Sequence, residues 1–305
     1  MKTFRKNSIS KLLIIAGIAS FAGCSSEVGS NEKLVESAVD SSATKQQKIS
    51  DEAIGEIIKS IPSPIEISML IKESGSNYNN TILNSNANYS KYNSNFKKAL
   101  NLGVYGADLG YINIYDEGVD ALSYLSSIKS LADGLNIGQF YDFATIKRLA
   151  SNSKNIDSLL LITTMNFEKI NTFLYEEKRS DQCVLILTGG WLEALHISCE
   201  VYKSSQKAEI LEKIGEQKIV LDQLLLLLSN YNNQPNIKFL YTELEKLKEI
   251  YAKVEITYVY HESTAKEVDG VLMIVNETES KVNITPEQVN QISTIIENLR
   301  LKVTA

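Results

Sequence analysis

The 305-residue chain has few of the residues on which most catalytic chemistry depends. It has only two histidines and three cysteines, and it contains no phosphate-cradling glycine loop, no Gly-x-Ser-x-Gly motif and no HExxH motif. With so few histidines, an enzyme would need carboxylate acid–base chemistry, and no carboxylate pair stands out from solvated surface charge. We therefore expect a protein that is not an enzyme, with no catalytic residues and no cofactor.

Proline and glycine are also scarce, with four and fifteen residues among abundant Leu, Ile, Lys and Glu. This composition favours helices. Beyond the first 24 residues, no apolar run approaches the ~18 residues that a membrane-spanning helix needs. We predict an all-α fold, an antiparallel multi-helix bundle that forms a single helical domain over residues 48–305.

Basic residues are outnumbered, and their distribution is uneven. Four of the 31 basic residues lie in residues 1–23, which leaves 27 against 37 acidic residues and a net charge of about −10 for the rest of the chain. Such an acidic surface repels phosphate backbones, so no nucleic-acid partner is expected. It also argues against attachment to anionic lipid through a basic patch.

The N-terminal stretch carries the most specific pattern in the chain. Lys2, Arg5, Lys6 and Lys11 lie before or at the start of the apolar run Leu12–Ala22, which closes at Phe21-Ala22-Gly23-Cys24. The pattern resembles the signal of the bacterial lipoprotein class, which is cleaved before a cysteine. The resemblance implies that residues 1–23 are a signal peptide and that Cys24 becomes the acylated first residue, with the lipid bilayer as partner. The alternatives are an ordinary secretory signal or an uncleaved anchor.

The segment after Cys24 indicates where such an anchor would lie. Residues 24–47 are rich in Ser, Glu, Lys and Ala without apolar periodicity, which predicts a disordered tether. In the lipoprotein class, Asp after the cysteine commonly retains the protein in the inner membrane, and here Ser25 follows. The resemblance therefore implies the periplasmic side of the outer membrane, with the cell surface as the alternative.

Apolar periodicity and capping residues predict the elements of the body. Residues 271–284 alternate weakly and are either a small β-hairpin or an irregular excursion. Residues 75–95 hold eight asparagines and three tyrosines, which predicts a long surface loop or, as an alternative, a glycan-binding loop. Helices are expected over 51–60, 64–75, from 96 onward, 117–132, 138–150, 156–177, 181–202, 206–231, 238–260 and from 286 onward.

The helix that begins near Phe96 contains three glycines, which cost up to about 1 kcal/mol each in a helix. Close contact with a neighbouring helix would offset this cost, because the small residues share one side of the cylinder. These residues are Gly103, Gly106, Ala107 and Gly110. The next helix, over 117–132, is expected to end at Asp133-Gly134 in the left-handed conformation.

The helix over 181–202 is apolar around nearly its whole circumference, apart from one stripe formed by Glu193, His196 and Glu200. A Glu-x-x-His pair has the spacing that di-iron bundles use, but such a site needs two of these pairs. The other histidine of the chain, His261, is far away in the sequence and is not part of such a pair. The pattern around Glu193 is partly repeated around Asp108, where an acidic residue also follows small residues and an aromatic ring, that of Tyr111, comes three residues later. If the two helices pack with pseudo-symmetry, Asp108 and Glu193 approach each other. The alternatives are a ligand or metal site, or a buried acid bonded to Tyr105 or Tyr111, with His196 satisfied by backbone or by Glu200.

The candidate ligand-binding residues are thus Asp108, Tyr111, Trp191, Glu193 and His196, and no metal ligand is assigned. Trp191 reads as a core anchor or as an exposed stacking ring. Cys183 and Cys199 lie about 24 Å apart along one helix at 1.5 Å per residue, too far for a disulfide. We expect two buried thiols.

The stretches Ala99–Tyr111 and Gly189–Leu195 resemble an uncharacterised family of helical lipoproteins of Gram-negative bacteria. That resemblance implies no particular activity. The sequence thus favours a membrane-anchored periplasmic lipoprotein that acts as a non-catalytic helical scaffold or binding module. The alternatives are a metal- or small-ligand-binding protein that uses the acidic/His cluster, and a glycan-binding lipoprotein.

Overall fold

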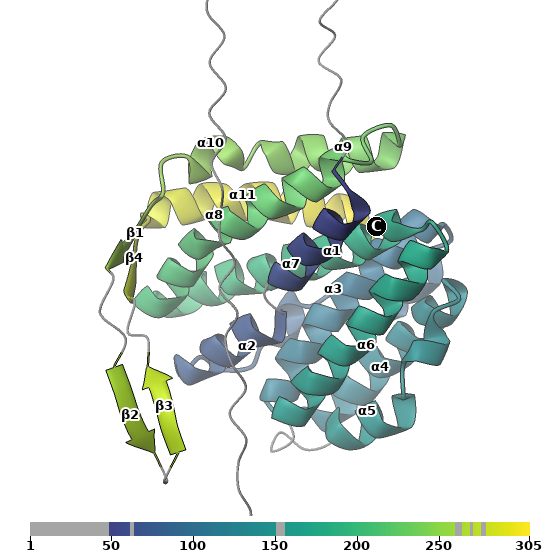
Figure 1. Cartoon of the computed structure of the whole chain (residues 1–305), viewed down its shortest axis with the longest axis horizontal. Coiled ribbons are helices and arrows are strands. Elements are labelled where there is room, and N and C mark those ends of the chain that lie inside the picture. Colours follow the sequence, from purple (N-terminus) through teal and green to yellow (C-terminus); the bar gives the residue numbers. More distant parts are fainter. Residues whose placement is uncertain (1–48, 62–63, 151–155, 260–263, 269–270, 276–278) are drawn as a thin grey trace, which may run out of the picture. The chain divides into compact units, whose positions relative to one another are not determined.

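The computed structural model describes residues 49–61, 64–150, 156–259, 264–268, 271–275 and 279–305. Lys48–Ala305 form one compact unit. The predicted signal peptide, Cys24 and the tether lie outside the described residues. The described residues fold into eleven α-helices packed as a bundle, with a small antiparallel β element near the C-terminus (Figure 1). The predicted all-α fold class is confirmed.

The helices follow the predicted order closely. Three short 3₁₀ segments, Asn80–Ile82, Asn86–Lys91 and Gly138–Phe140, lie in the connections. The α-helices are α1 (Asp51–Ser60), α2 (Pro64–Glu73), α3 (Asn95–Ile114), α4 (Gly118–Gly134), α5 (Phe143–Ala150), α6 (Ile156–Glu176), α7 (Ser180–Ser205), α8 (Ala208–Ser229), α9 (Pro235–Glu245), α10 (Lys248–Tyr251) and α11 (Pro286–Thr304).

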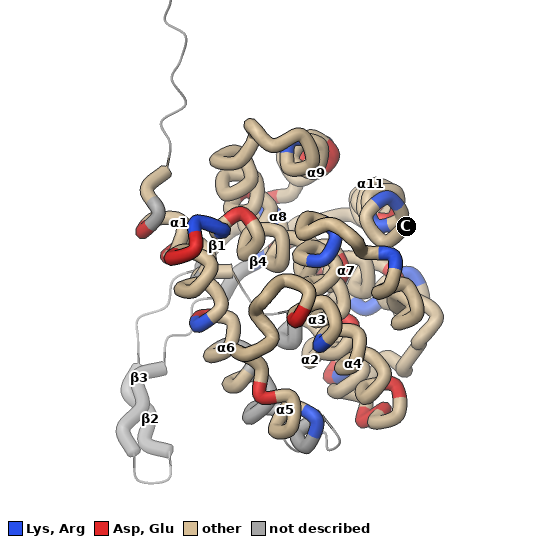
Figure 2. Tube along the Cα trace, turned by 90° about the vertical axis from the view of Figure 1, so that its right-hand side faces the viewer, with Lys and Arg blue, Asp and Glu red and all other residues tan. Residues whose placement is uncertain are grey.

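Helices α3 and α7 form the centre of the bundle, with α2 and α4 against α3 and with α8 and α11 against α7 (Figure 1). Helix α7 is long and apolar enough to cross a membrane by length and composition. Most of it is buried inside the protein, as in the core helix of a folded domain. Acidic and basic residues are interspersed along the described helices, as Figure 2 shows.

The two central helices pack backbone against backbone. A Cβ atom on Gly103 would lie 1.9 Å from the carbonyl oxygen of Ile186, and one on Gly189 would lie 1.9 Å from that of Leu100. Only glycine fits such an approach. The predicted glycine contact is therefore real at Gly103, but it is wrong for Gly106, which is exposed and would meet nothing within 4 Å.

Helix ends follow ordinary capping chemistry. The Ser94 side chain accepts from the backbone N–H of Lys97 at the start of α3, and Thr285 and Gln288 form a reciprocal capping box on α11. The left-handed residue after α4 is Asn136 (φ 57°), two residues beyond the predicted stop at Gly134. Asparagine tolerates this conformation because its short side chain bonds locally.

The β element differs from the predicted hairpin over 271–284. Its strands are β1 (Glu255–Val259), β2 (Thr264–Val268), β3 (Val271–Val275) and β4 (Glu279–Asn283). Strand β3 pairs with β2, and β4 pairs with β1, both antiparallel, so β3 and β4 belong to two separate two-stranded sheets and do not pair with each other. The single helix predicted over 238–260 is wrong: the structure has α9, which ends at Glu245, and α10, which ends at Tyr251. The segment Glu255–Val259 forms a strand instead, because it is rich in β-branched and aromatic residues.

The β1–β4 ladder packs onto α8 at Gly215. A Cβ atom there would lie 2.4 Å from Cγ1 of Val282, which is buried. Ile256 pairs with Val282 across the ladder and is half-buried. This contact holds β1, the strand that carries Ile256, beside α8.

Candidate functional site

Four ionisable side chains from three helices meet in the core and form what we call the buried charge cluster: Asp108 (α3), Glu193 and His196 (α7), and Arg300 (α11). Arg300 donates from Nε to Oε2 of Glu193 at 2.7 Å and from Nη2 to Oε1 at 2.6 Å. The Glu193 side chain is 0% exposed and that of Arg300 is 13% exposed. This two-point, charge-assisted pairing is among the stronger polar contacts in proteins.

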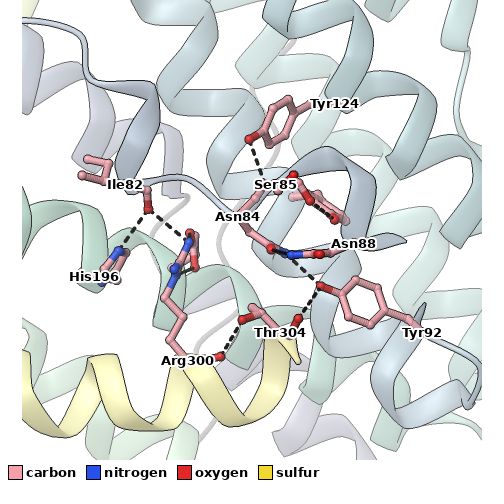
Figure 3. A network of polar contacts seen from close by, with 11 residues as sticks. Ile82, Asn84, Ser85, Asn88, Tyr92, Tyr124, His196, Arg300 and Thr304 are labelled. Carbon is pink, nitrogen blue, oxygen red and sulfur yellow. Dashed lines mark hydrogen bonds and ion pairs between the residues drawn. The ribbon is translucent and has the colours of Figure 1, made fainter. Parts of the chain in front are cut away.

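His196 and Arg300 share one acceptor, the backbone carbonyl oxygen of Ile82. His196 Nε2 and Arg300 Nη2 both lie 3.1 Å from it (Figure 3). A carbonyl oxygen only accepts, so the imidazole proton must be on Nε2. Burial lowers the pKa of His196, although the nearby Glu193 carboxylate acts in the opposite direction. His196 is therefore a neutral donor, and its Nδ1 has no partner among the described residues.

Asp108 is fully buried, and neither carboxyl oxygen accepts a hydrogen bond from a described nitrogen or hydroxyl donor in ordinary geometry. Its carboxyl group lies within hydrogen-bonding reach of the Glu193 carboxylate. Burial raises the pKa of Asp108 well above its ordinary value, and Glu193 raises it further, while Arg300 and the backbone amide of Asn84 act against them. A carboxyl group in this setting favours the neutral form.

Tyrosine hydroxyls donate hydrogen bonds to the backbone of residues 76–94, the segment between α2 and α3. Tyr124 donates to the carbonyl oxygen of Asn84 at 2.8 Å, and Tyr105 donates to that of Ser85 at 2.8 Å. Tyr92 donates to the carbonyl oxygen of Thr304 at 3.2 Å and accepts from Nδ2 of Asn84 at 3.1 Å (Figure 3). Asn84 and Tyr92 are buried, so part of the Asn/Tyr-rich stretch faces inward, unlike the surface loop that was predicted.

Of the predicted site residues, the structure brings Asp108, Glu193 and His196 together, and it places the other two elsewhere. The hydroxyl of Tyr111 accepts from the backbone N–H of Asn79 at 3.1 Å, and its ring stacks on Tyr78 at 5.5 Å. Trp191 is buried and donates from Nε1 to Oε1 of Gln217 at 3.0 Å. It is a core anchor.

The expected tyrosine partner of the buried acid is wrong. The hydroxyls of Tyr105 and Tyr111 bond to the 76–94 segment, and the partner of Glu193 is Arg300. Arg300 is not among the site residues that the sequence predicts, although two signals point to it. The chain has only four arginines among its 31 basic residues, and Arg300 lies four residues after Ile296 beside the buried face of α11. An arginine there suggests planar recognition of a carboxylate.

The arrangement offers little to a metal ion. Both oxygens of Glu193 are bonded to Arg300, which already supplies a positive charge. Within the part of the chain that the structure describes, no group of three His, Cys, Asp or Glu side chains could hold a metal ion. What the cluster can do is hold three helices and the 76–94 segment together.

A separate groove of about 570 Å³ lies between α2, α8 and strand β1. Its size falls in the range of roughly 300–1,000 Å³ that is usual for small-ligand sites. The Lys213–Glu216 ion pair (2.6 Å) is part of its lining. Gln217, the partner of Trp191, also lines it. The lining residues are Ser60, Ile67, Met69, Leu70, Glu73, Lys213, Glu216, Gln217, Ile219, Val220, Gln223, Ile256 and Tyr258.

Comparison with protein-family models, with curated proteins and with solved structures gives no match. The geometry of the described residues and the sequence pattern around Cys24 are therefore what a functional proposal has to rest on.

Proposed function

We propose that the chain is a lipid-anchored lipoprotein on the periplasmic side of the outer membrane, whose helical body acts as a non-catalytic scaffold or binding module. One observation carries this proposal: a basic N-terminal stretch and an apolar run close at Phe21-Ala22-Gly23-Cys24. Small residues before a cysteine at the end of such a run are what lipoprotein processing requires.

The properties of the body support this role. The sequence after residue 23 has a net charge of about −10, so acyl chains on Cys24 have to provide the attachment. Each buried methylene contributes ~0.8 kcal/mol, and stable anchoring takes more than one chain. The buried charge cluster is used internally, whereas the groove beside α8 is open to a partner or a small ligand. A binding role therefore belongs to the groove more naturally than to Asp108, Glu193 and His196.

The anchor is tested by expressing the full chain in a Gram-negative host beside Cys24→Ala and the matched control Ser25→Ala. We expect the wild type and Ser25→Ala to fractionate with membranes and to carry an acylated N-terminal cysteine by mass spectrometry. Cys24→Ala should be released from the membrane. An unacylated wild-type N-terminus would overturn the anchor.

The membrane and its face need separate variants and measurements. Ser25→Asp should move the protein from the outer to the inner membrane, because Asp at this position is the retention signal of the class. External protease should leave the wild-type body intact in whole cells and digest it after the outer membrane is opened. Digestion in whole cells would move the proposal to the cell surface.

A further inference from the structure

The buried charge cluster must balance its charges, because an unpaired ion in a dry core is costly. Glu193 receives two short N–H bonds from Arg300, so Glu193 is the carboxylate of the ion pair. His196 is a neutral donor. If Asp108 were ionised as well, two carboxylates would face one guanidinium, and the core would hold a net negative charge.

The contacts of Asp108 argue for the neutral acid independently of its charge. An ionised carboxylate only accepts hydrogen bonds, and the backbone N–H of Asn84, the donor directed at Asp108, makes no hydrogen bond of ordinary geometry with either of its oxygens. A protonated Asp108 has one O–H to give, and the Glu193 carboxylate lies within reach as the acceptor. Protonation thus converts a clash between two acceptors into a hydrogen bond.

We propose that Asp108 is protonated in the folded protein at neutral pH and donates this proton to Glu193, and that loss of the proton at alkaline pH loosens α11 and the 76–94 segment from the α3–α7 pair. The proposal is independent of the lipid anchor. It assigns the cluster a role as a conformational switch that responds to pH.

The other titratable groups around Asp108 do not supply an alternative charge. Three tyrosines face it, Tyr105 on α3, Tyr124 on α4 and Tyr92 before α3, and all three donate to backbone carbonyls. Burial raises the pKa of each. On α7, Glu193 bonds to Arg300, while Glu200, close to His196, pairs with Lys203 at 2.6 Å. Arg300 is the cation that faces the cluster from α11.

The packing predicts which contacts yield first. Helices α3 and α7 are interlocked through Gly103 and Gly189, so they cannot easily separate to relieve repulsion. Helix α11 and the 76–94 segment meet the cluster through Arg300 and the carbonyl oxygen of Ile82, at the edge of the interlocked pair. A second negative charge would compete with Glu193 for Arg300 and disturb both contacts.

The direction of the pH effect follows from linkage. Asp108 has a folded-state pKa above its unfolded value, so its contribution to stability is complete below the unfolded pKa. The contribution is lost as pH rises through the folded-state pKa. The switch therefore opens toward alkaline pH.

The proton itself is measured by carbon-13 NMR on the full-length chain in detergent, with the aspartate carboxyls labelled. We expect one carboxyl signal to keep the chemical shift of a protonated acid at about pH 7, where ordinary aspartates are ionised. The signal should be absent in Asp108→Asn and present in Asp222→Asn, a matched control at an exposed site on α8. If every aspartate signal titrates at its ordinary pH, the proposal is overturned.

The opening is measured by hydrogen exchange, corrected for the intrinsic effect of pH. Between about pH 7 and pH 10, exchange in α11 and residues 76–94 should rise about tenfold more than in α7 in the wild type and in Asp222→Asn. Asp108→Asn, whose amide cannot ionise, should show no such rise. An equal rise in Asp108→Asn, or none in the wild type, would contradict the switch. If Asp108→Asn fails to fold, the proposal is tested on the wild type alone, by its carboxyl signal at about pH 7 and by its exchange between about pH 7 and pH 10.

Discussion

At the residue scale, two glycines in α3 with the same helical setting have opposite roles. The Gly103 Cα faces the backbone of α7, where an added Cβ would lie 1.9 Å from Ile186 O and 2.6 Å from the backbone nitrogen of Gly190. Gly106 is exposed, and an added Cβ would meet nothing within 4 Å. Backbone atoms cannot move aside as the end of a side chain can, so the first site has no room for alanine.

We predict that Gly103→Ala destabilises the protein by about 3 kcal/mol or more, because α3 and α7 must move apart. Gly106→Ala should instead stabilise it by about 0.5–1 kcal/mol, since alanine has the higher helix propensity. Chemical denaturation of both variants and the wild type gives the two free energies of unfolding. Equal effects of the two substitutions would contradict the close backbone contact.

The sequence predicted that some glycine of this helix touches a neighbour, because several glycines in one helix need compensation. It did not separate Gly103 from Gly106. The two lie three residues apart on the same side of the cylinder, and the choice between them depends on the angle at which α7 crosses α3. This crossing angle cannot be predicted from the local sequence of either helix.

At the element scale, α11 is attached to the centre of the bundle by a buried ion pair. The partners Glu193 and Arg300 lie 107 residues apart in sequence. Desolvation makes the net value of such a pair small, whereas removal of one partner leaves an unpaired charge in the core. The pair thus serves mainly to fix where α11 lies.

We predict that Glu193→Gln and Arg300→Met each cost about 3–5 kcal/mol of unfolding free energy. The double variant should cost much less than the sum, because neither charge is then left alone. Lys302→Met is the control on the same helix: Lys302 is 49% exposed and pairs with Glu243 at 3.0 Å, so its loss should cost less than about 1 kcal/mol. Additive effects of the two buried substitutions would speak against direct coupling.

The elements themselves were largely readable from apolar periodicity and caps, and the failures have physical causes. The first half of residues 238–260 is strongly helical, which predicts one helix across the segment, although Glu255–Val259 favours a strand. In the candidate site, Glu193 and His196 share a helix face, and the small residues around Asp108 suggested its proximity. Arg300 comes from a helix that is distant in sequence. The sequence indicates its role only through the small number of arginines in the chain and the apolar residues on either side of Arg300.

At the scale of the whole molecule, acid stability depends on a histidine that the fold keeps neutral. His196 donates to Ile82 O, and burial lowers its pKa below the ordinary value of 6.5. The folded state therefore binds this proton less readily than the unfolded chain does. The contribution of His196 to stability is present above the unfolded pKa and is lost as pH falls through the folded-state pKa.

We predict that the free energy of unfolding of the wild type decreases relative to that of His196→Gln between about pH 7 and pH 5, a comparison in which the opposite contribution of Asp108 cancels. Glutamine keeps an N–H donor for Ile82 O but does not titrate. At pH 7 the substitution should cost only about 1 kcal/mol. Parallel pH profiles for the two proteins would show that His196 has no part in the acid limb.

Trp191 is the single tryptophan of the chain, and its indole N–H bonds to Gln217, which lines the groove beside α8. Tryptophan emission from the protein therefore comes from one indole ring, and only one hydrogen bond separates that ring from the groove. A molecule that enters and turns the Gln217 amide will change the wavelength or intensity of this emission. The chain thus contains its own optical probe, with which unlabelled protein can be screened against ligand libraries.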